Sequence, residues 1–130
     1  MRRVMAGLAS LGLFASAAIA HPANGPTFAA LAKIERGQWQ LRGTGSPARS
    51  ICIADPTILF QLRGKPAGCS RLVIENTAAS ATVNYSCSNG AHGRTTIAVE
   101  TPRLMRIDSQ GVEGGAPFVI EIEARRTGGC

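Results

Sequence analysis

The second half of the chain alternates between apolar and polar residues with a period of two, the pattern of a β-strand that has one face in a core. The pattern is longest near the C-terminus, where Phe118, Ile120, Ile122 and Ala124 alternate with Val119, Glu121, Glu123 and Arg125. Further strands are predicted at residues 37–42, 50–53, 72–74, 82–87, 95–100 and 105–108. The 72–74 run is apolar throughout and is expected to be buried.

Short strands separated by turn-forming residues are typical of an antiparallel meander. A sheet of about seven short strands is expected to curl into a small barrel or sandwich, which protects its edges. We therefore predict a mainly β domain. In its first strand, Trp39 and Leu41 point toward the core.

One segment predicts a helix instead, at about residues 56–63. Asp55 can cap the exposed backbone amides, Pro56 suits the first helical position, and Gly64 can adopt the left-handed conformation that ends a helix. The apolar stripe of this helix consists of Ile58, Leu59 and Leu62. A helix of about two turns is not stable alone, so it must pack on the sheet.

The N-terminus has the organisation of a bacterial export signal. A basic start is followed by an apolar run up to residue 20, and Ala18 and Ala20 are the small residues that signal peptidase requires. We predict cleavage after Ala20 and a periplasmic product that starts at His21. The apolar run is short for a membrane span of about 20 residues, so no stable membrane insertion is expected after cleavage.

The remaining chain divides into two predicted regions. Residues 21–34 contain two prolines and are expected to form a poorly ordered leader with a possible short helix. Residues 35–130 are expected to form a single β-rich domain.

Charge changes this picture little. Without the two arginines of residues 1–20, 12 basic and 8 acidic residues remain, which gives a net charge of +4. The basic residues are scattered and are not interleaved with aromatic residues, so no nucleic-acid partner is expected.

The four cysteines predict two disulfides, because an even number in a short exported chain is typical of a disulfide framework. No Cys-x-x-Cys pair is present to indicate zinc. A hairpin centred on Ala78 places Cys69 opposite Cys87 and leaves Cys52 to pair with Cys130. The rival pairing, Cys52–Cys69 with Cys87–Cys130, stays open at this stage.

The order of several short motifs resembles a family of small exported proteobacterial proteins known only as domain of unknown function 3617. These motifs are Gly37-x-Trp39, Cys52-Ile53-x-Asp55-Pro56, Cys69 at the start of a strand, Tyr85-x-Cys87 and the terminal Arg126-Thr127-Gly128-Gly129-Cys130. The resemblance implies an exported location and a similar fold. It implies no catalytic or binding residue.

Few residues suggest chemistry. The carboxylates of Glu121 and Glu123 could form a glycosidase-like pair, but on an outward face beside Arg125 they are interpreted as cross-strand salt-bridge partners. No histidine has an evident catalytic partner, so we expect neither enzyme activity nor a cofactor. The α-amine and imidazole of His21, with His92, form a candidate Cu(II) site.

Binding is therefore the predicted function. The first hypothesis is a structural or protein-interaction module that contacts an unknown envelope protein. The alternative is a pocket for a small apolar ligand, lined by the large aromatic residues Trp39, Phe60, Tyr85 and Phe118. The other interpretation of these four residues is that they pack in the core. An enclosed apolar cavity favours the ligand carrier, whereas a filled core with exposed apolar residues favours the interaction module.

Overall fold

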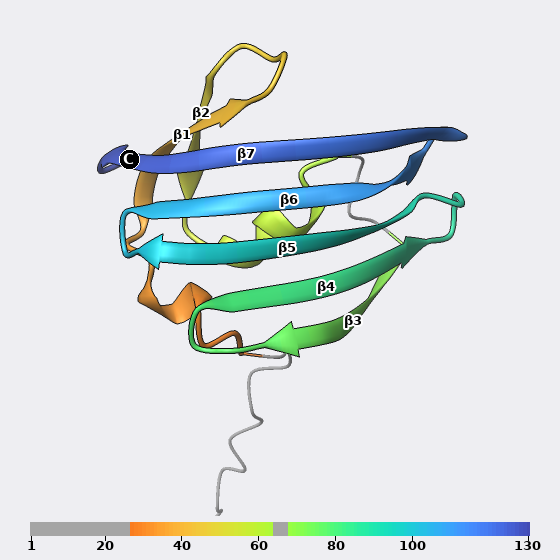
Figure 1. Cartoon of the computed structure of the whole chain (residues 1–130), viewed down its shortest axis with the longest axis horizontal. Helices are drawn as coiled ribbons and strands as arrows, with labels where there is room; N and C mark the ends of the chain where they lie inside the picture. The colour runs from red at the N-terminus through yellow and green to blue at the C-terminus, as the bar shows by residue number, and fades with distance from the viewer. Residues whose placement is uncertain (1–26, 64–67) are drawn as a thin grey trace, which may run out of the picture.

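The computed structural model describes residues 27–63 and 68–130, which form one seven-stranded antiparallel sheet. The strands are β1 (Gly37–Gly43), β2 (Arg49–Ile53), β3 (Cys69–Asn76), β4 (Ser80–Cys87), β5 (His92–Thr101), β6 (Leu104–Glu113) and β7 (Ala116–Gly128). Two 3-10 helices accompany them, η1 (Leu31–Lys33) and η2 (Pro56–Gln61). Strands β3 to β7 form a meander, and the β1–β2 hairpin is added beside β7 (Figure 1). The predicted mainly β, antiparallel fold class is confirmed.

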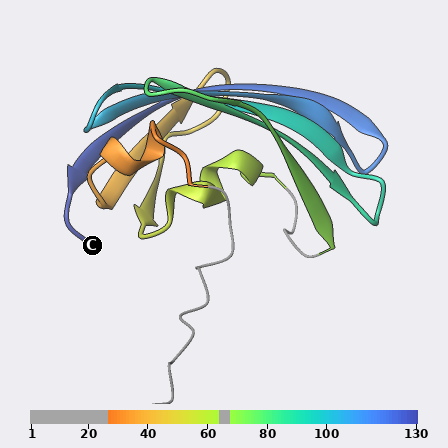
Figure 2. The ribbon, with the colours of Figure 1, turned by 90° about the horizontal axis from the view of Figure 1, so that it is seen from below.

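The sheet is strongly arched, and η1 and η2 lie within its concavity (Figure 2). We call the face toward these helices the inner face and the opposite one the outer face. The strand order is β2-β1-β7-β6-β5-β4-β3, so β2 and β3 are edges and the sheet is not closed. Of the two predicted architectures, the fold is the sandwich-like one, with the 3-10 segments as the second layer.

The core fills the inner face. Rows of side chains cross several strands, such as the row made by Ala81, Ile97, Ile107 and Ile122. Trp39 and Leu41 point inward as predicted, and both are buried. The polar Thr95 is also buried, and its hydroxyl donates to the Phe60 carbonyl at 2.8 Å and lies 2.8 Å from the Ser109 hydroxyl. The buried Thr95 hydroxyl is therefore hydrogen-bonded, as burial requires.

The predicted helix is present but differs in type and in its buried face. Asp55 caps it, since its carboxylate accepts a hydrogen bond from the Thr57 amide at 2.9 Å. The helix is 3-10 rather than α, with about three residues per turn. Leu59 is buried as predicted, and Leu62 is partly buried against the core. Ile58, however, is turned away from the sheet, 44% exposed, and Phe60 is buried in its place. Gly64, the predicted helix stop, lies outside the described residues.

The expectation that residues 72–74 are buried was wrong. Leu72 is 64% exposed and Ile74 is 42% exposed. The reason is position: β3 is an edge strand with one neighbour, and both described helices lie on the inner face, so no described element covers the outer one. The register shifts between Val73 and Glu75, which marks a β-bulge at Ile74.

The packed unit begins before the predicted boundary at residue 35. Phe28, Leu31 and Ile34 belong to the hydrophobic core, and Lys33 donates to the Ala78 carbonyl at 2.7 Å. Residues 1–26, including the predicted signal, its cleavage position and His21, lie outside the described part. None of the described helices is long and apolar enough to cross a membrane.

Both predicted disulfides are confirmed. Cys69 lies directly opposite Cys87 in the β3–β4 register, with the Cα atoms 3.9 Å apart. Cys52 is joined to Cys130 with a Cα separation of 5.8 Å. The second bridge passes over β1, because Gln38 pairs with Cys52 on one side and with Gly128 on the other.

Candidate binding groove on the outer face

Two of the four predicted pocket residues are core residues. Trp39 is completely buried, and its indole Nε1 donates to the Glu35 carbonyl at 2.9 Å. Phe60 is also completely buried and packs against Phe28, with ring centroids 4.7 Å apart. Their surroundings are filled by the protein's own side chains, so they do not form a ligand pocket.

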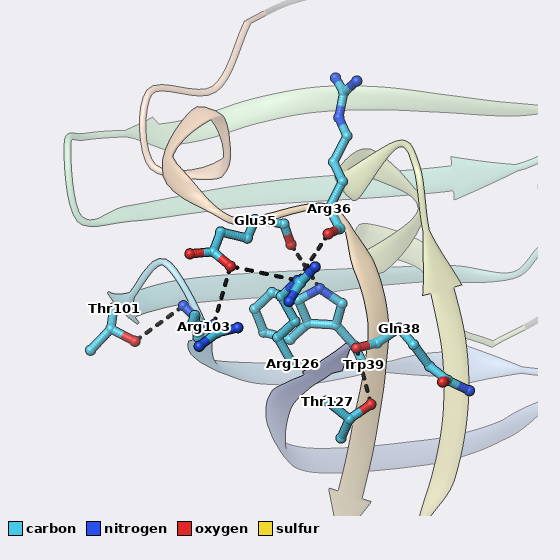
Figure 3. Close-up of polar contacts among 8 residues, drawn as sticks. All are labelled: Glu35, Arg36, Gln38, Trp39, Thr101, Arg103, Arg126 and Thr127. Atoms are coloured by element: carbon cyan, nitrogen blue, oxygen red, sulfur yellow. Dashed lines mark hydrogen bonds and ion pairs between the residues drawn. The ribbon is translucent and has the colours of Figure 1, made fainter. Parts of the chain in front are cut away.

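Hydrogen bonds and ion pairs connect the residues around Trp39 (Figure 3). Arg126 donates from Nε to the Arg36 carbonyl at 2.9 Å and lies 3.6 Å from the Glu35 carboxylate. The same carboxylate lies 3.1 Å from Nε of Arg103. These contacts fix the segment before β1 against the ends of β6 and β7, which is a structural role.

The other two predicted residues, Tyr85 and Phe118, form a separate cluster with Cys87. The Tyr85 ring lies over Gly93, where a Cβ atom would be 2.5 Å from the tyrosine oxygen. Burial raises the pKa of Tyr85, and the nearby Glu113 carboxylate adds to the rise. Glycine at position 93 is therefore required for the ring to pack.

On the outer face behind this cluster lies an open groove of about 760 Å³, which we call the outer groove. One wall follows a row of directly paired residues, namely Leu72, Asn84, Arg94, Gln110 and Val119. Since neighbouring strands are about 4.8 Å apart, this row is about 19 Å long. Leu72 and Val119 stand at its two ends and are 64% and 75% exposed.

The outer groove is basic as well as apolar. Arg94 is its charged side chain on the outer face, and the exposed His92 lines it too, with Nδ1 3.1 Å from the Gly90 carbonyl. The Arg71 side chain is directed to the inner face, where it contacts the Thr57 carbonyl. No aspartate or glutamate is among the described residues that line it. Such a surface favours an occupant that carries carboxylates and apolar groups.

The opposite half of the outer face is different, because its charges are compensated within the protein. Arg125 donates from Nε to the Glu123 carboxylate at 2.7 Å, and Arg42 and Arg106 pair with Glu123 on either side. The Arg125 hydrogen bond lowers the pKa of Glu123. Glu123 is therefore in an ion pair, as predicted, but its partner lies on the same strand rather than on a neighbouring one. Glu121 instead stands opposite Asp108 and has no ion pair among the described residues.

The candidate copper site is not assembled in the described residues. His92 stands alone in the outer groove, and His21 lies outside the described part of the chain. Within that part, no group of three or more His, Cys, Asp or Glu residues is placed to hold a metal ion. The Cu(II) hypothesis stays a prediction.

A second hollow of about 830 Å³ lies between the β1–β2 loop, the end of η2 and β7. Its apolar lining includes Leu41, Leu62, Ile120 and Ile122, and its charged lining includes Arg63. None of the four aromatic residues predicted for a pocket lines it. Sequence reasoning missed it because the loop and the helix end meet only in the folded chain.

Comparisons with protein-family models, with curated proteins and with solved structures found no match to this chain. The geometry of its surfaces therefore carries the functional argument. Of the residues that line the outer groove, Tyr85 and Phe118 were predicted for a pocket and His92 for a copper site. The period-two pattern also places the apolar Val119 outward.

Proposed function

We propose that the chain is a non-catalytic protein-interaction module that is exported to the envelope of a Gram-negative bacterium. The observation that carries the proposal is the contrast between its two faces. The largest inner side chains, such as Trp39 and Phe60, are completely buried, whereas Leu72 and Val119 are exposed on the outer face. Exposed apolar side chains favour an interaction surface when they belong to one groove, as Leu72 and Val119 do at the two ends of the outer groove.

The cellular location is part of the same proposal. Two disulfides suit an oxidising compartment. The export pattern up to Ala20 suits the bacterial periplasm. The resemblance to the exported family with domain of unknown function 3617 agrees with both and remains a prediction.

Native mass spectrometry of protein purified from the periplasm tests this proposal. The expected species starts at His21, is lighter than the reduced chain by four hydrogens and carries no small molecule. A full-length chain found only in membranes would contradict export. A bound Cu(II) ion that is lost when His21 is removed would favour the copper hypothesis.

The second hollow supports one alternative, a carrier of a small apolar ligand. Its volume lies within the range of about 300–1,000 Å³ typical of ligand sites. A stoichiometric small-molecule adduct in the same mass spectrum, lost in Leu62→Glu, would favour this alternative over the interaction module.

A second test examines the interaction directly. A photo-reactive benzoylphenylalanine in place of Val119 should form a discrete adduct with an envelope protein. The same residue in place of Glu123, on the compensated half of the outer face, is the matched control and should not form it. Equal labelling from both positions would contradict a specific outer-groove interaction.

A further inference from the structure

The backbone hydrogen bonds of β4 show which groups of β3 are unused. The Cys87 amide donates to the Ala91 carbonyl at 2.8 Å, on the β5 side, and the Ser88 amide donates to the Gly68 carbonyl at 2.9 Å, on the β3 side. Because antiparallel ladders alternate, Tyr85 and Val83 also direct their backbone groups toward β5.

The partners of these residues in β3 are Arg71 and Val73. Their pairs with β4 are of the non-hydrogen-bonded kind, so their N–H and C=O groups point away from the sheet, out of its edge. Among the described residues, no backbone hydrogen bond to the Arg71 or Val73 main chain comes from outside the sheet. The far end of the strand is covered, because the Asn76 side chain bonds Thr27 and Ala29.

The two edges of the sheet are not equivalent. β2 has five residues, and Cys52 within it is tied to Cys130. Its apolar residues Ile51 and Ile53 are directed to the core, and none of the exposed large apolar side chains of the described chain lies on it. β3 has eight residues and exposes Leu72 and Ile74 beside its unused backbone groups.

The chemistry beside the β3 edge defines its occupant. Arg71 is exposed on the inner side of the β3 edge. Its guanidinium lies 3.4 Å from the Thr57 carbonyl, and its charge adds to the Thr57 hydrogen bonds in lowering the pKa of Asp55. A carboxylate directly across from Arg71 in an added strand would form a cross-strand charge pair. Leu72 would contact an apolar side chain of the same strand on the outer face. A lipid could use the apolar and basic groups but not the row of backbone donors and acceptors.

We propose that β3 binds an extended segment of a partner protein as an eighth strand, with acidic residues facing Arg71 and apolar residues facing Leu72. The inference rests on the proposed function and specifies its partner. It is the strand-addition mode of peptide recognition, in which the main chain supplies affinity and alternate side chains supply specificity.

Amide hydrogen exchange measured by NMR tests the edge before any partner is known. In the free protein, the Arg71 and Val73 amides should exchange fast while the Ser70 and Leu72 amides are protected. The probe is a capped seven-residue peptide in which Glu and Val alternate. At saturation it should slow exchange at Arg71 and Val73 about tenfold or more. A peptide with Lys in place of Glu should have no effect.

Two variants and one control make the result specific. Val73→Pro removes an outward N–H and leaves the bonds to β4, so it should keep the fold and lose the protection. Arg71→Glu should lose the acidic peptide and gain the Lys peptide. Arg42→Glu, with the same charge change on the opposite side of the sheet, should bind the acidic peptide as the unmodified protein does.

Protected Arg71 and Val73 amides in the free protein, or equal protection by both peptides, would overturn the inference. Binding of phosphatidylglycerol vesicles that survives Val73→Pro, without protection by either peptide, would also overturn it, in favour of a lipid surface. These failures leave the native mass spectrum and the Val119 cross-link unaffected, so they are distinguishable from failure of the proposed function.

Discussion

The inner and outer faces of the sheet are made of alternate residues of the same strands, but they serve different purposes. On the inner face, Ile97, Met105 and Ile107 are completely buried, and the hydroxyl of Thr95 is fully engaged. On the outer face, Leu72 and Val119 are exposed. The buried core is therefore concentrated on the inner face, and the proposed interaction is assigned to the outer face.

The outer face is itself divided. Its half around Glu123 has arginine and glutamate in mutual contact, and such exposed pairs contribute at most about 1 kcal/mol each. The half around Arg94 has cations and apolar groups without carboxylates. The carboxylates of a binding partner would pair with Arg94 in this half, as the protein's own Glu123 pairs with Arg125 in the other half.

The largest expected effect concerns the bridge that holds the end of the outer face. The Cys52–Cys130 bridge closes a separation of 78 residues and Cys69–Cys87 one of 18. On the chain-entropy model they contribute about 4.5 and about 3 kcal/mol. Urea unfolding of Cys52→Ser/Cys130→Ser should therefore show a larger loss than that of Cys69→Ser/Cys87→Ser. Equal losses would show that native packing, not chain entropy, sets their contributions.

Removal of an inner side chain should be almost as costly. Trp39→Ala should lower the free energy of unfolding by about 4 kcal/mol, because it opens a cavity in a closed core. Val119→Ala, on the outer face, should change it by about 0.5 kcal/mol or less. Both are measured by urea titration followed by circular dichroism. A Trp39→Ala variant with unchanged stability would indicate a ligand-lining role and would break the comparison of the two faces.

A buried hydroxyl gives a smaller effect. Thr95→Val removes the donor to the Phe60 carbonyl and the partner of Ser109, and should cost about 1–3 kcal/mol. The matched control is Thr96→Val on the outer face, whose hydroxyl lies 2.9 Å from that of Thr82. Its loss should be less than half as large, since water can reach this half-buried position. Equal costs would mean that the outer face is as closed as the inner one.

The helix cap gives the smallest effect. Asp55→Ala should cost about 1 kcal/mol by removing the acceptor of the Thr57 amide. The hydrogen bonds from the Thr57 backbone and side chain lower the pKa of Asp55 below 3.8. The charged form is therefore stabilised by folding, and this contribution is present above pH 3.8 and is lost as the pH falls through the lowered pKa.

The free energy of unfolding, measured between pH 2 and pH 5, tests this direction of the pH dependence. Asp55→Asn keeps an acceptor, so it should retain most of the stability at pH 5 and lose the acid-dependent part. An unchanged pH dependence in Asp55→Asn would show that other carboxylates cause the loss of stability at low pH.

The sequence alone predicted the parts of this protein that depend on local patterns. Alternation placed Trp39, Ile107 and Ala124 on the inner face, because the side-chain period of a strand is two whatever its neighbours are. The position of the Ala78 turn paired Cys69 with Cys87, because a hairpin register follows from its turn. The cap at Asp55 needed only the residues next to it.

Only the tertiary structure decided the rest. The apolar Leu72 is exposed because β3 became an edge, and Phe28 is buried because the sheet arches over it. The sequence did not distinguish the 3-10 form of η2 from an α-helix, since packing between the two edges selects it. The outer groove draws residues from five strands. Its apolar ends and Arg94 come together only through strand order, which one sequence leaves undetermined because it depends on which strands pair.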